Sequence, residues 1–164
     1  MDRQQIGLKL AMDSLGIPVQ MGTFEDRLVL QKAVYLAEAA EVALGYHFRW
    51  YLRGPYCSLL ASDGFSVETS QDEADQWTLD GDSLENLRGI QSLMQKSRPA
   101  DMELAPWLEL LASVHFLVSR KQVAHDDIHE ILSTLEKYNK RYDKPQVQRA
   151  LRRLRKHGLL RVPA

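Results

Sequence analysis

Residues 28–43 constrain the fold more than any other stretch of this chain, because they are apolar on nearly every side of a helix. Thr23, followed by Asp26, has capping-box spacing and predicts where this helix begins. A helix that is apolar all round is normally buried in the middle of a domain. We therefore expect a central helix against which the rest of the chain packs. Its apolar residues are Leu28, Leu30, Ala33, Val34, Tyr35, Leu36, Ala37, Ala39, Val42 and Ala43.

Lys32 is the unexpected residue of this helix, since it projects among apolar neighbours. One interpretation is that its aliphatic stem lies along the apolar surface while the ammonium group reaches water. The other is that the ammonium group pairs with a carboxylate and fixes the helix against the next segment. The sequence leaves both interpretations open.

The segment after the central helix combines aromatic residues with turn signals. Gly45 ends the helix, and residues 46–52 alternate with period two, which predicts a short, half-buried strand. The Arg-Gly-Pro-Tyr sequence at 53–56 predicts a turn, and a further helix follows from 58 to 65. The central helix and the aromatic segment that follows it are both too apolar to be left exposed. We expect a structural corner against the central helix, formed by Trp50, Tyr51, Pro55 and Tyr56.

This order of motifs resembles the YwgA-like predicted regulators and, more distantly, the Panacea-domain proteins. The resemblance implies a mostly helical bacterial, archaeal or phage protein. Panacea-type proteins are associated with toxin neutralisation by direct binding, and YwgA-like proteins with predicted transcriptional regulation. The resemblance marks a partner-binding surface or structural corner at Gln31, Lys32, Tyr35, Trp50, Tyr51, Arg53, Gly54, Pro55 and Tyr56, with further matches at Leu30, Leu36 and Asp63.

Charge is distributed very unevenly along the chain. Residues 137–164 carry ten of the 21 Lys and Arg residues and one of the 22 Asp and Glu residues, so the net charge of -1 combines an acidic body with a basic tail. Such a split indicates nucleic acid or an acidic partner, or a tail that docks on its own body.

The basic tail also has helix-turn-helix order. A helix through Ile128 and Leu135 is followed by a turn, and Lys144-Pro145 then begins a second helix with the apolar stripe Val147, Leu151 and Leu154. An extended piece at 159–162 resembles the start of a winged-helix wing. Cationic side chains opposite an apolar stripe suit a helix in the major groove. The predicted nucleic-acid contacts are Gln148, Arg149, Arg152, Arg153, Arg155 and Lys156, although an acidic protein surface or simple solvation would suit the same face.

The remaining residues predict further helices and no catalytic centre. Helices are expected at 1–15, 83–96 and 101–120, with a short strand at 76–79 anchored by Trp77. His115 is expected to be a hydrogen-bonded core histidine, and Cys57 a packing residue. His125 and His129 have a spacing that zinc sites use, but no third ligand accompanies them, so no metal is expected. We expect no enzyme activity and no cofactor, because no nucleophile–base pair or phosphate-binding glycine loop is present.

The sequence therefore predicts a mostly α fold with a short β segment, ending in a winged-helix-like helix-turn-helix. Its organisation is either two parts, 1–97 and 98–164, or one compact domain. A single cysteine, no signal peptide and no membrane-length apolar run predict a cytoplasmic protein. The favoured function is a prokaryotic or phage regulator that binds DNA, with a homodimer as the expected form. The alternative is a protein-interaction module, such as an antitoxin or an anti-phage defence subunit.

Overall fold

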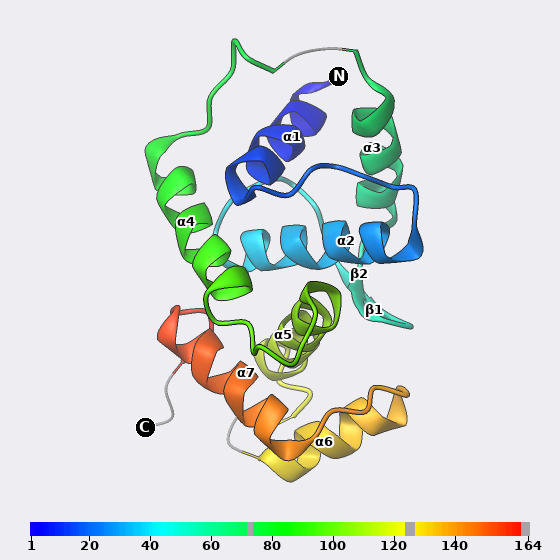
Figure 1. Ribbon diagram of the computed structural model, residues 1–164, viewed down its shortest axis with the longest axis vertical. Helices are drawn as coiled ribbons and strands as arrows, with labels where there is room; N and C mark the ends of the chain where they lie inside the picture. The colour runs from blue at the N-terminus through cyan, green and yellow to red at the C-terminus, as the bar shows by residue number, and fades with distance from the viewer. Residues whose placement is uncertain (72–73, 124–126, 162–164) are drawn as a thin grey trace.

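The fold is mostly helical with one small antiparallel hairpin, as the sequence predicts (Figure 1). The computed structural model describes residues 1–71, 74–123 and 127–161. In chain order the elements are α1 (Arg3–Leu15), α2 (Phe24–Ala39), β1 (Arg49–Tyr51), β2 (Gly54–Tyr56), α3 (Ser58–Thr69), α4 (Gly81–Gln95), α5 (Leu104–Ser119), α6 (Ile128–Lys137) and α7 (Lys144–Lys156).

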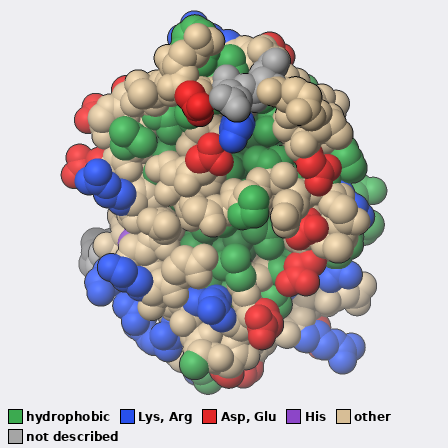
Figure 2. Space-filling view, turned by 45° about the horizontal axis from the view of Figure 1, so that its top comes forward, with side chains coloured by type: hydrophobic (Ala, Val, Ile, Leu, Met, Phe, Trp, Pro, Cys, Tyr) green, Lys and Arg blue, Asp and Glu red, His purple; other side chains and the backbone are tan. Residues whose placement is uncertain are grey.

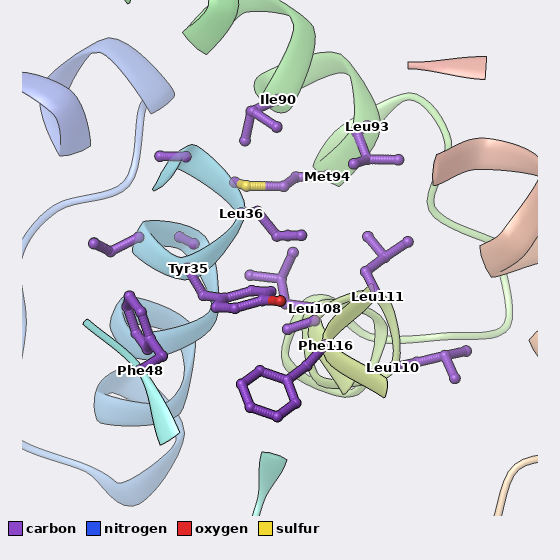
Figure 3. Packing of buried hydrophobic residues seen from close by; sticks show 14 of the residues in the cluster. Tyr35, Leu36, Phe48, Ile90, Leu93, Met94, Leu108, Leu110, Leu111 and Phe116 are labelled. Carbon is purple, nitrogen blue, oxygen red and sulfur yellow. The ribbon is translucent and has the colours of Figure 1, made fainter. Parts of the chain in front are cut away.

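Helices α2 and α5 pack against each other at the centre of the molecule. Every residue of α2 from Leu30 to Ala37 is buried, which confirms the predicted central helix. It begins at the predicted Thr23 capping box but ends at Ala39, before Glu41 adopts a positive φ of 67°. Figure 3 shows how side chains from α2, α4 and α5 interlock, with Tyr35 lying edge-on to Phe48 at 5.2 Å between ring centroids.

One hydrophobic core extends from α1 to the residues after α7. α3 and α4 pack on α2, and α1 packs on α3 and α4, whereas α6 and α7 pack on α5, so α5 links the two regions. The division into residues 1–97 and 98–164 stays a prediction, and the two segments share this core.

The hairpin corrects two predictions. Gly54 and Pro55 lie in β2 instead of a turn, because Tyr51 pairs with Gly54 and the chain reverses at Leu52 and Arg53. The backbone of Gly54 has a φ of +93°, a conformation that glycine tolerates. The predicted period-two burial holds at Tyr46 and Phe48, but only residues 49–51 form a strand and Leu52 is 71% exposed at the tip.

Two smaller predictions, a strand at 76–79 and an extended piece at 159–162, are not confirmed. Residues 76–79 form no strand, and Trp77 is 51% exposed, whereas Leu79 packs against the core. After α7, residues 157–160 form turns and bends, and no strand follows at residue 161. The predicted wing continues to residue 162, and the predicted histidine pair includes His125. Both positions lie outside the described residues.

Candidate functional site

The first candidate surface is the outward face of α7. Asp143 and Gln146 form a capping box at its start, and Pro145 occupies the first turn, where its missing N–H is tolerated. Arg152 and Lys156 are exposed on the opposite side from the core. The buried stripe that holds the helix to α5 and α6 consists of Val147, Ala150, Leu151 and Leu154.

The other predicted contacts on α7 are less accessible. Gln148, Arg153 and Arg155 are half-buried. Arg149 is also half-buried, and its Nε donates to the Ser97 carbonyl oxygen at 3.4 Å. The structure therefore brings all six predicted residues onto one helix but leaves Arg152 and Lys156 the most exposed.

Several cationic side chains of α7 have no carboxylate partner among the described residues. In the part of the chain that the structure describes, no ion pair joins Arg149, Arg152 or Lys156 to a carboxylate. Figure 2 shows Lys and Arg side chains gathered at the lower left, the side on which Figure 1 places α7, whereas acidic side chains lie mostly elsewhere. This distribution produces a local positive potential that an anionic partner would experience.

The second candidate surface is the hairpin and the start of α2. Gln31, Lys32, Tyr35, Gly54 and Pro55 are buried there. The predicted corner is only partly correct, because Pro55 is buried but both tyrosines of the corner are exposed. Trp50 is half-buried, whereas Arg53 is exposed, as are Tyr51 at 59% and Tyr56 at 38%.

Lys32 follows the second of its two predicted arrangements in part. Its side chain is 1% exposed, and Nζ donates to the Pro55 carbonyl oxygen at 2.7 Å. Burial lowers the pKa of Lys32 to about 7, with a further lowering by Lys140 and an opposing effect of Glu109. The lysine thus fixes α2 to the hairpin, as the second interpretation proposed, through a backbone carbonyl in place of a carboxylate.

Gln31 makes a second connection between α2 and the hairpin. Its Nε2 donates to the Cys57 carbonyl oxygen at 2.8 Å, and its Oε1 accepts from the Cys57 N–H at 2.9 Å. Cys57 itself is buried in the core, as expected of a packing residue.

A buried ion pair beside the hairpin was missed by sequence reasoning. Lys140 Nζ lies 2.6 Å from Glu109 Oε1 and 3.5 Å from the Leu52 carbonyl oxygen. Burial lowers the pKa of Lys140, and the hydrogen bond that its ammonium group donates to Glu109 opposes this effect. The signal was available, because Glu109 interrupts the apolar run of α5, but its partner is 31 residues away in the chain.

The core histidine prediction is confirmed. His115 Nε2 donates to the Leu159 carbonyl oxygen at 3.1 Å, and burial lowers the pKa of the ring. The neutral ring then accepts the Tyr35 hydroxyl at Nδ1, over 2.7 Å. This chain of bonds connects α2, α5 and the segment that follows α7.

The titration of Lys32 predicts how stability depends on pH. A folded-state pKa of about 7, against an ordinary value of 10.5, means that between these values the unfolded chain binds more protons. Stability should therefore rise with pH, by roughly 2 kcal/mol from pH 7 to pH 9 relative to Lys32→Met. Urea unfolding at both pH values measures the difference. The exposed Lys96→Met is the matched control, and a pH-independent gap between wild type and Lys32→Met would contradict the assignment.

Comparison with protein-family models, with curated proteins and with solved structures found no match to this chain. Among the described residues, no helix has both the length and the apolar character needed to cross a membrane.

Proposed function

We propose that this protein binds double-stranded DNA through the outward face of α7 and acts as a regulator of prokaryotic or phage origin. One observation carries the proposal: the basic face stands on a helix whose opposite side is fully anchored in the core. A rigid support of this kind can hold cationic side chains at the spacing of phosphates and base edges.

The arrangement of α5, α6 and α7 supports this proposal. Each of the three packs against the other two, and residues 138–143 connect α6 to α7. Helix-turn-helix proteins place a recognition helix in the major groove, and the preceding helices hold it there. The wing and the homodimer remain predictions.

The proposal is tested by fluorescence anisotropy with duplex DNA from the protein's own promoter region, over a range of salt concentrations. The double variant Arg152→Glu, Lys156→Glu should stay folded, because both side chains are exposed. It should bind at least about tenfold more weakly, and the slope of log affinity against log salt should fall by about 0.9 for each lost phosphate contact.

The matched control is Arg3→Glu, Arg88→Glu, which makes the same change in net charge at exposed positions of α1 and α4. It should lose far less affinity than the α7 variant. No binding by the wild type at low salt would refute DNA binding. Equal losses in both double variants would show that net charge, and not the α7 face, determines affinity.

The protein-interaction alternative is favoured by a different observation. Phe24, Tyr51, Leu52, Leu59 and Phe65 are all large hydrophobic residues that are at least 49% exposed. Exposed hydrophobic groups of this kind are common at interfaces. If DNA binding fails and the α7 variant also loses a co-purifying protein, the basic face is a docking site for an acidic partner.

A further inference from the structure

A cavity of about 400 Å³ lies between the start of α2, the hairpin tip and α3. Figure 1 places the hairpin beside the N-terminal end of α2, with α3 also packed on that helix. Its volume falls in the range of small-molecule sites. The surface of the cavity is mainly apolar, with Phe24, Tyr51 and Tyr56 as its aromatic walls.

The charged residues along this cavity all have the same sign. Arg27, Lys32 and Arg53 line it, and no acidic residue of the described chain does. Arg27 Nη1 donates to the Met21 carbonyl oxygen at 2.8 Å, which holds its guanidinium in place. The Arg53 guanidinium lies 5.3 Å from the centre of the Phe24 ring, so it connects the hairpin tip to the start of α2.

Lys32 adds a buried cation with spare donor capacity. An ammonium group has three N–H donors, and within the described residues the Pro55 oxygen accepts one of them. Desolvation makes a buried ammonium costly unless it is paired. An anion that entered the cavity would supply the missing negative charge.

We propose that the cavity binds a small organic anion, with an aromatic or aliphatic body between Phe24, Tyr51 and Tyr56 and its carboxylate or sulfonate group on the basic residues Arg27, Lys32 and Arg53. A free small molecule fits better than an extended peptide. A peptide that paired with β2 as an extra strand would need free backbone groups along β2. Side chains of α2 already bond to the Pro55 carbonyl and to the carbonyl and N–H of Cys57, so these groups cannot pair with a peptide.

The experiment uses 1-anilinonaphthalene-8-sulfonate, a fluorescent aromatic sulfonate, titrated into the full-length protein at 0.15 M salt, where charges beyond about 8 Å are screened. We expect saturable binding of one molecule per chain. Arg53→Glu should weaken it by about tenfold or more, because the exposed guanidinium supplies a charge-assisted hydrogen bond.

The matched control is Arg88→Glu, the same charge reversal at an exposed residue of α4, an element that does not line the cavity. It should change affinity by less than about twofold, because a distant surface charge is screened at this salt concentration. N-phenyl-1-naphthylamine, which has the same rings without the sulfonate, should bind at least about tenfold more weakly, because it lacks the charge-assisted hydrogen bonds.

Ala61→Phe provides a second test, because Ala61 lines the cavity and a ring there would fill it. A variant that melts like the wild type and no longer binds the probe supports the site. Equal binding of both fluorophores, or equal effects of Arg53→Glu and Arg88→Glu, would overturn the proposal and assign the signal to an exposed apolar surface.

Discussion

Replacing Glu109 by alanine is expected to lower the free energy of unfolding by about 3 to 5 kcal/mol. The reason is that the substitution leaves the ammonium group of Lys140 buried without its carboxylate. The side chains of Lys140 and Glu109 are 3% and 10% exposed, and their charged atoms lie 2.6 Å apart. The remaining acceptor near Lys140, the Leu52 carbonyl oxygen, is 3.5 Å away.

Urea unfolding followed by circular dichroism measures this loss. The exposed Glu103→Ala, on the residue that precedes α5, is the control and should change stability by no more than about 0.5 kcal/mol. The double variant Glu109→Met, Lys140→Met removes both charges and should recover most of the loss. A loss below about 1 kcal/mol for Glu109→Ala would show that the ion pair is hydrated in solution.

Gly54→Ala is expected to destabilise the protein by roughly 3 kcal/mol, through two separable causes. The φ of +93° is strained for any residue with a Cβ atom. In addition, a Cβ at this position would lie 2.5 Å from Ser113 Oγ, well inside van der Waals contact.

A double-mutant cycle separates these causes. Ser113 Oγ is buried without a hydrogen-bond partner among the described residues, so Ser113→Ala alone should be neutral or stabilising. Combined with Gly54→Ala it removes the clash, and roughly 1 to 2 kcal/mol of backbone strain should remain. Gly89→Ala, at a helical position with open space around it, should stabilise α4 by about 0.5 to 1 kcal/mol. If the effects of Gly54→Ala and Ser113→Ala on stability are strictly additive, the predicted contact between residues 54 and 113 is contradicted.

The helices could be predicted because their signals are local. Thr23 and Asp26 cap α2, Asp143 and Gln146 cap α7, and the apolar periodicity of each helix lies within its own residues. The hairpin turn was misplaced because Gly-Pro is compatible with both a turn and a short edge strand. The pairing of Tyr51 with Gly54, which decides between them, depends on packing against distant helices.

The candidate sites were predictable to different extents. The basic face of α7 could be predicted because its cationic residues and its apolar stripe repeat with helical spacing within one segment. All six predicted nucleic-acid contacts therefore fall on that helix. The cavity beside α2 could not be predicted, since Phe24, Arg53 and Ala61 meet only after three separate elements pack together. Lys32 was recognised as unusual, but sequence alone gave no indication that a backbone carbonyl would be its partner.

The contacts of Gln31 and Lys32 with β2 have a consequence for self-association. A sheet of two three-residue strands would normally offer an open backbone edge to any extended chain, including another unfolded copy. Here an amide side chain takes the place of a neighbouring peptide group at Cys57, and an ammonium group does so at Pro55. The helix thereby takes the place of a third strand along β2, which protects that edge of the hairpin from the edge-to-edge pairing that begins aggregation.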